Sequence, residues 1–117
     1  MKKQAFLSLC LLFGACSFHD KDLGYGYKYM VLDFSSHTIV TLDNIIVVDP
    51  DIVRYAQQDP YIVGERRRLP DAYDDPDFSR KFGYFILNMQ TGEYIEGLDK
   101  TAFDEALRTR GVAVQLN

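Results

Sequence analysis

The sequence predicts an α+β fold: an antiparallel β meander of about five to seven strands with one C-terminal helix, after a cleaved signal peptide. Two observations lead to this fold class. Several short runs rich in aromatic and β-branched residues are separated by turn residues, as in antiparallel sheets. One stretch near the C-terminus instead has apolar residues at helical spacing between capping residues.

The first fifteen residues form a candidate signal peptide. It begins with two lysines after the initial Met, and its apolar stretch, residues 5–13, is too short to span a bilayer as a permanent helix. Two small residues then precede Cys16. This layout resembles the lipobox of bacterial lipoproteins, with Phe13 where that motif usually has Leu, Val or Ile. The resemblance implies that Cys16 is acylated and becomes the first mature residue. In the alternative, an ordinary signal peptide is cut nearby and Cys16 is a free thiol.

The mature chain would then contain a tether, residues 16–24, and a single α+β domain, residues 25–117. The tether is assigned because this stretch is mostly polar and shows no periodicity. Cys16 is the only cysteine after the signal, so acylation would leave none for a disulfide. No second apolar stretch has spanning length, so we expect the lipid to be the only membrane attachment.

Strands are expected wherever aromatic and β-branched residues gather. The segments are residues 25–34, 38–42, 45–48, 61–66, 82–87 and 93–96. Asp43 and Asn44 predict a two-residue hairpin turn, because both tolerate positive φ. Residues 45–48 are apolar on both faces, which favours a central position in the sheet. Residues 52–56 fit either a helical turn or an irregular strand, and the alternating residues 112–116 predict a short terminal strand.

The helix is expected between Asp99 and Gly111. Asp99 is the predicted N-cap, with Thr101 and Asp104 as an overlapping alternative, and Gly111 is placed as the C′ glycine. Its predicted buried face consists of Ala102, Phe103, Ala106, Leu107 and Arg110.

The segment of residues 67–81 predicts a long exposed loop, because it contains two prolines and four aspartates and few apolar residues. A loop of this kind on a rigid sheet is a natural place for a partner to bind. The charged side chains of this loop would steer the encounter with the partner, whereas the rings of Tyr73 and Phe78 would supply affinity. The candidate partner-binding residues are Arg66, Arg67, Arg68, Tyr73, Asp74, Asp75 and Phe78.

Other interpretations of these residues stay open. The basic run of residues 66–68 and the acidic group that follows it could screen each other internally. The aspartates could also bind calcium, although their spacing does not match an EF-hand loop; they are Asp71, Asp74, Asp75 and Asp77. The nearby tyrosines Tyr25, Tyr27 and Tyr29 fit cross-strand packing better than a binding surface.

No grouping of residues in the sequence predicts an enzyme. His19 lies in the expected tether and His37 in an expected turn, where both would be solvated. The sequence lacks a glycine-rich phosphate loop and the HExxH, CxxC and GxSxG motifs, and no metal or cofactor is predicted. Without the two lysines of the signal, eleven basic residues stand against seventeen acidic ones, a formal net charge of −6. Such a charge argues against nucleic acid as a partner and is compatible with a cationic one.

The order of short motifs resembles a family of small bacterial lipoproteins whose globular part is a domain of unknown function. The resemblance is carried by Asp22-Leu23-Gly24-Tyr25-Gly26-Tyr27, by residues 59–64, by residues 84–92, and by Gly97-Leu98 with Thr101-Ala102-Phe103. It covers most of the mature chain, and it implies a secreted α+β or mostly-β module with no catalytic residues.

These observations together predict a lipid-anchored, non-enzymatic protein of the bacterial cell envelope that binds another protein. By analogy with other small periplasmic lipoproteins, the role would be that of an immunity protein or an inhibitor. An accessory or structural subunit of an envelope assembly and a small-ligand or metal-binding module are the alternatives. Ser17 follows Cys16 in place of the aspartate associated with inner-membrane retention. The lipoprotein resemblance therefore implies an outer-membrane anchor facing the periplasm.

Overall fold

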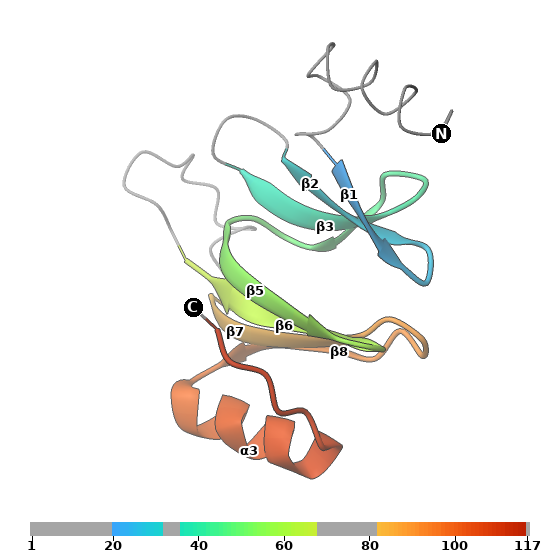
Figure 1. The fold of residues 1–117 in the computed structure, drawn as a ribbon. Coiled ribbons are helices and arrows are strands. Elements are labelled where there is room, and N and C mark those ends of the chain that lie inside the picture. Colours follow the sequence, from blue (N-terminus) through green and yellow to red (C-terminus); the bar gives the residue numbers. More distant parts are fainter. Residues whose placement is uncertain (1–19, 32–35, 68–81, 117) are drawn as a thin grey trace, which may run out of the picture.

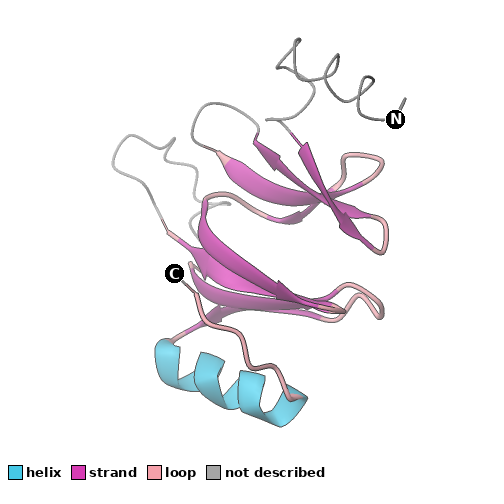
Figure 2. Cartoon of the chain, in the orientation of Figure 1, coloured by secondary structure: helices cyan, strands magenta, loops and turns pink. Residues whose placement is uncertain are grey.

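The computed structural model describes residues 20–31, 36–67 and 82–116. These residues form eight strands and one helix in three layers (Figure 1). Two four-stranded sheets are stacked, and the helix covers the outer face of the second sheet (Figure 2). A mostly antiparallel domain with one C-terminal helix is confirmed. The described strands, however, exceed the predicted five to seven and form two sheets instead of one meander.

Each sheet is a meander of its own, with neighbouring strands antiparallel. Sheet A consists of β1 (Asp20–Gly24), β2 (Tyr27–Val31), β3 (His37–Thr41) and β4 (Ile46–Val48). Sheet B consists of β5 (Ile52–Gln58), β6 (Tyr61–Arg66), β7 (Gly83–Asn88) and β8 (Tyr94–Leu98). In both sheets the strands lie side by side in chain order.

All four edge strands carry a bulge, whereas the inner pairings are regular. The register shifts in the β1–β2, β3–β4, β5–β6 and β7–β8 pairings. In each of them the extra residue lies on the edge strand, that is, on β1, β4, β5 or β8. The central pairings, β2–β3 and β6–β7, show no shift. A bulge bends its strand and interrupts the ladder of hydrogen bonds.

Two apolar clusters hold the layers together. The first fills the space between the sheets and consists of Leu23, Ile39, Val48, Ile52, Ile62, Phe85, Leu87 and Met89. The second lies between sheet B and the helix and consists of Val63, Ile86, Phe103, Leu107 and Val112. Successive residues of β6 and β7 alternate between the two clusters, because side chains of a strand point to opposite faces. Sheet B is therefore the central layer and is covered on both faces.

The helix α3 (Lys100–Arg110) begins and ends where the sequence predicts. Asp99 is its N-cap, and its side chain accepts a hydrogen bond from the backbone N–H of Ala102 at 2.8 Å. Gly111 follows in the left-handed conformation. Phe103 and Leu107 form the buried face, as expected, whereas Ala102 is exposed.

Two strand predictions are corrected at the edges of sheet A. Residues 45–48 do not form a central strand: β4 is an edge strand, and Ile46 is 40% exposed. Residues 20–24, the end of the predicted tether, form β1, where Leu23 is buried against the core. The side chains did not indicate that β4 and β1 are edge strands. β4 is apolar although it lies at an edge, and β1 is mostly polar although it is a strand.

Two further segments differ from the expectation. Residues 52–58 form the bulged strand β5, which settles the ambiguity between turn and strand. Residues 112–116 are extended but pair with no described strand. Their alternating residues Val112, Val114 and Leu116 pack against the second apolar cluster instead, which explains the pattern without a ladder.

Candidate interaction surface

The predicted basic run does not form one exposed surface, because Arg66 is buried. Its exposed fraction is 1%, and its guanidinium reaches the link between the two sheets. Nε donates to the carbonyl of Asp49 at 2.8 Å, and Nη2 donates to the carbonyl of Pro50 at 2.9 Å. The prediction that Arg66 is exposed to a partner is therefore wrong. Because side chains alternate between the two faces of a strand, the position of Arg66 on β6 directs its side chain between the sheets.

The carboxylate of Glu96 on sheet B is a further partner of Arg66. Nη1 of Arg66 lies 3.4 Å from Oε1 of Glu96 on β8, and the hydroxyl of Tyr94 donates to the same oxygen at 2.9 Å. Burial, together with this hydrogen bond to Glu96, raises the pKa of Tyr94 far above its ordinary range. Phe82 covers the guanidinium with its ring, 5.1 Å from centroid to Cζ. This group ties β6 and β8 to the link between the two sheets; Arg66 is fully buried in it, whereas the Glu96 side chain is 27% exposed.

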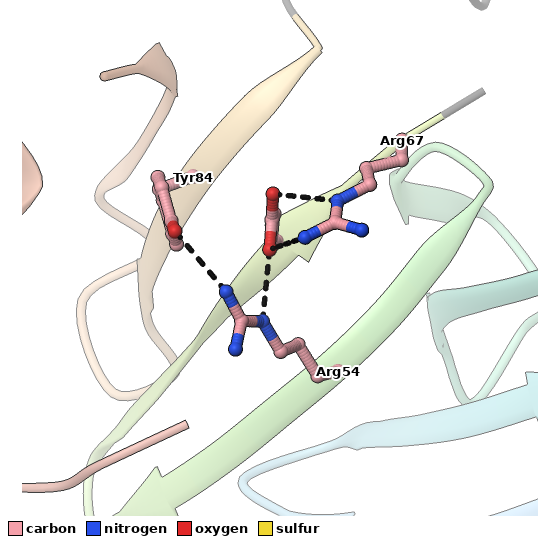
Figure 3. A network of polar contacts seen from close by, with 4 residues as sticks. Arg54, Arg67 and Tyr84 are labelled. Carbon is pink, nitrogen blue, oxygen red and sulfur yellow. Dashed lines mark hydrogen bonds and ion pairs between the residues drawn. The ribbon is translucent and has the colours of Figure 1, made fainter. Parts of the chain in front are cut away.

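Arg67 is exposed and pairs with Glu65 on the opposite, helix-facing side of sheet B. Its Nε donates to Oε2 of Glu65 at 2.8 Å, and Nη2 donates to Oε1 at 3.1 Å. Arg54 of β5 donates from Nε to the same Oε1 at 2.8 Å and from Nη2 to the hydroxyl of Tyr84 at 3.2 Å (Figure 3). Burial acts to raise the pKa of Glu65, but the hydrogen bonds from Arg67 and Arg54 outweigh it and hold the pKa below its ordinary value.

The other residues of the predicted binding loop lie outside the described residues. These are Arg68, Tyr73, Asp74, Asp75 and Phe78, together with Asp71 and Asp77 of the calcium alternative; the lipidation residue Cys16 and His19 also lie outside. Within the described ranges, no group of three or more His, Cys, Asp or Glu side chains is arranged to hold a metal ion. No helix within those ranges is long and apolar enough to cross a bilayer.

A different surface gathers the exposed apolar side chains. Among the described residues, four large hydrophobic side chains are exposed: Tyr25 (48%), Leu42 (60%), Ile45 (63%) and Ile46 (40%). Tyr25 lies in the turn between β1 and β2, and the other three lie in or next to the turn between β3 and β4. The two turns are neighbours, because the N–H of Leu42 donates to the carbonyl of Gly26 at 3.1 Å. We call these four residues the hairpin-tip patch.

The backbone holds both turns of the hairpin-tip patch in defined shapes. Thr41 fixes the second turn: its N–H donates to the carbonyl of Ile45 at 2.9 Å, and its hydroxyl accepts from the N–H of Ile45 at 3.1 Å. Asn44 has φ 65°, but Asp43 does not have a positive φ, and because Thr41 pairs with Ile45 the loop contains Leu42, Asp43 and Asn44 instead of the predicted two residues. The apolar side chains are therefore presented by ordered backbone, which lowers the entropy cost of binding.

Tyr25 occupies an unusual backbone position in this patch. Its φ is 58°, and it stands between two glycines that also have positive φ, Gly24 at 89° and Gly26 at 86°. The left-handed region disfavours a residue with a large side chain and favours glycine. The middle residue of these three thus carries an exposed aromatic ring where a glycine would relieve strain. Such outliers are concentrated at functional sites.

The sequence contained a signal for this patch that composition alone did not indicate. Leu42 and Ile45 flank the turn residues Asp43 and Asn44, so their side chains had to lie near a hairpin tip.

The expectation that the three neighbouring tyrosines serve cross-strand packing is met in part. Tyr27 and Tyr29 pack against the first apolar cluster, and the Tyr29 ring stacks on Tyr55 at 4.4 Å, whereas Tyr25 is exposed.

His37 is not in a solvated turn. It is the first residue of β3 and is half-buried, and its Nδ1 lies 2.9 Å from the hydroxyl of Tyr29. The two rings meet edge to face with centroids 5.6 Å apart. This contact supports packing between neighbouring strands.

No family model, curated protein or solved structure matches this chain. The resemblance to small bacterial lipoproteins thus stays a prediction from short motifs, and function has to be argued from the surfaces described above.

Proposed function

We propose that this chain is a lipid-anchored protein of the bacterial cell envelope that binds a protein partner through the hairpin-tip patch and catalyses no reaction. The observation that carries the proposal is the gathering of all four exposed large hydrophobic side chains of the described residues at two adjacent turns. Monomeric proteins rarely expose large contiguous apolar patches, and the patches that they do expose often mark interaction sites.

The sheet edges are poor alternatives for binding. A partner that adds a strand needs a regular row of free backbone groups. Each of the four edge strands is interrupted by a bulge, and β4 has only three residues. Bulges and short strands are the devices that protect sheet edges from pairing. Contact through side chains at the hairpin tips is therefore the better-supported mode.

The position of the anchor favours a protein over the lipid surface as the occupant of the patch. β1 begins at Asp20, so only four residue steps separate it from Cys16, a reach of about 14 Å. Tyr25 follows the opposite end of β1, about 13 Å further along a five-residue strand. Asp43, exposed at the second tip, would also lose its hydration in a bilayer. We infer that the patch faces away from the anchoring membrane.

The partner is best identified by a photo-crosslinking residue placed in the living cell envelope at Leu42. A matched control carries the same residue at Arg108, which is exposed on α3 at the far side of sheet B from sheet A (Figure 1). We expect one protein adduct from position 42 and none from position 108. Equal adducts from both positions, or adducts to lipid alone, would contradict the proposal.

Tyr25 provides the sharper test once the partner is known. Tyr25→Gly removes the ring and relieves its backbone strain, so we expect weaker binding by about tenfold or more with an unchanged or slightly higher melting temperature. A loss of both binding and stability would mean that the ring serves the fold instead. Glu105→Ala on the outer surface of α3 is the control and leaves affinity unchanged.

Anchoring is tested separately. Cys16→Ala prevents acylation, so we expect the chain to leave the membrane fraction or to accumulate unprocessed. Unchanged fractionation and gel mobility would show that Cys16 carries no lipid. The identity of the crosslinked partner and the neighbouring genes distinguish an immunity protein or inhibitor from the alternatives, which are an accessory subunit and a small-ligand or metal-binding module.

A further inference from the structure

A pocket of about 360 Å³ lies on the face of sheet B that points away from sheet A, between sheet B, α3 and the C-terminal segment. Its polar end is formed by Arg54 and Tyr84, and its apolar walls include Phe103, Leu107, Val114 and Leu116. This volume falls within the range of sites for small molecules. The pocket is independent of the surface to which the protein partner is assigned.

The cation at the polar end is held in place before any ligand arrives. The guanidinium of Arg54 uses Nε for Glu65 and one Nη2 hydrogen for Tyr84. A guanidinium has five N–H donors in a fixed fork, so donors remain for a further acceptor. The structure shows no other partner of Arg54 among the residues it describes. The hydroxyl of Tyr84, which accepts from Arg54, also keeps its own hydrogen for donation.

The charged groups at the polar end of the pocket are not balanced, and one anion would neutralise them. Glu65 is a single carboxylate shared between two guanidiniums, those of Arg54 and Arg67. Lys100 at the pocket rim is already paired with Asp104 at 2.8 Å. The group of Arg54, Arg67 and Glu65 therefore carries an excess of one positive charge. A planar carboxylate is the anion that best matches the fork of an arginine.

Four apolar side chains line the remainder of the pocket, beside the polar side chains of Lys100, Asp104 and Gln115. The rings of Tyr84 and Phe103 are stacked with centroids 4.5 Å apart and form an aromatic wall. Val114 and Leu116 face this wall from a segment that pairs with no described strand, so this side of the pocket has no ladder to hold it closed. We propose that the pocket binds a small carboxylate that carries an apolar chain or ring, with the carboxylate on Arg54 and Tyr84.

The probe for this site is octanoate, titrated into the purified full-length chain. Binding is followed by calorimetry and by the amide NMR shifts of residues 103, 107 and 114. We expect saturable binding in the millimolar range or tighter, with shifts confined to the pocket. 1-Octanol and octylammonium have the same apolar chain without the negative charge, and we expect each to bind at least tenfold more weakly.

Two substitutions separate the charge from the shape. Arg54→Gln should weaken octanoate about tenfold or more, whereas Arg54→Lys, which keeps the charge but loses the fork, should have an intermediate effect. Val114→Phe should block the apolar end and abolish binding while the charges remain. Arg108→Gln, on α3 but outside the pocket, is the control and should bind as the unaltered chain does.

Three results would overturn the proposal: no octanoate shifts at the pocket residues, 1-octanol binding as tightly as octanoate, or unaltered octanoate affinity in folded Arg54→Gln. If Arg54→Gln does not fold, the comparison of the three probes on the unaltered chain decides alone. None of these outcomes bears on the hairpin-tip patch, so this site and the protein-binding surface stand or fall separately.

Discussion

The ring of Phe85 lies across Gly64, its register partner on the neighbouring strand of sheet B. A Cβ atom built at Gly64 would come within 2.7 Å of Cζ of Phe85 and 2.5 Å of the backbone oxygen of Arg54. Gly64 is the residue that lets a fully buried aromatic ring fit between the sheets without displacing β5. The core of the sandwich thus depends on a missing side chain.

Gly64→Ala should lower the free energy of unfolding by about 1–3 kcal/mol, because a methyl group would overpack a dense core. Urea unfolding measures the change. In a Phe85→Leu background the same substitution should cost less, since the edge of the ring is gone, and this coupling identifies the contact. An equal cost in both backgrounds would assign the effect to the backbone of β5 alone.

Glu65→Gln should destabilise the chain by about 2 kcal/mol at neutral pH, because it removes the carboxylate that holds two arginines. The folded pKa of Glu65 is lowered, so its stabilising contribution is present above about pH 4.5 and is lost as the pH falls through the folded pKa. Melting curves of both proteins should therefore converge in acid. Glu105→Gln, an exposed control, should change little at any pH.

Arg66→Ala and Arg67→Ala should have very different effects although the residues are adjacent. Removing Arg66 leaves the Asp49 and Pro50 carbonyls without these donors and Glu96 without this cation, so we expect a loss of about 3–5 kcal/mol. Arg67 is exposed, and its removal should leave the melting temperature nearly unchanged. Similar small losses for both would contradict the burial of Arg66.

Asp99→Ala should destabilise the chain by about 1 kcal/mol through loss of the helix N-cap. Asp104→Ala removes only a surface ion pair with Lys100, so its effect should be much smaller. Chemical denaturation of the two variants distinguishes the capping arrangement seen here from the overlapping one that Thr101 and Asp104 would form. A larger loss for Asp104→Ala would favour the latter.

The elements that were predicted correctly are those whose signals are local. Asp99 and Gly111 delimit α3, and Asp43-Asn44 marks the place of a turn, although the loop there has three residues and only Asn44 has a positive φ. The edge position of β4 could not be read in the same way. Strand order depends on which strands meet in space, and the apolar character of β4 is equally consistent with a central strand and with an exposed edge strand.

The burial of Arg66 was hidden for a related reason. Its partners are Glu96, thirty residues further along the chain, and backbone carbonyls of the link between the sheets, which carry no side-chain signal. Residues 112–116 show the opposite error: alternation reports that one side is buried, but it does not report that the backbone is paired. The pocket lined by Arg54 and Leu116 joins segments that no motif connects.

If the chain is lipid-anchored, the bulges on β1, β4, β5 and β8 would also affect how neighbouring copies meet. Lipid-anchored copies share a plane and meet one another far more often than molecules free in solution. At such a local concentration, a regular unpaired edge strand could pair with strands of neighbouring copies and form extended intermolecular sheets. On such a surface, the extra residue in each of the four edges would keep closely packed copies from pairing edge to edge.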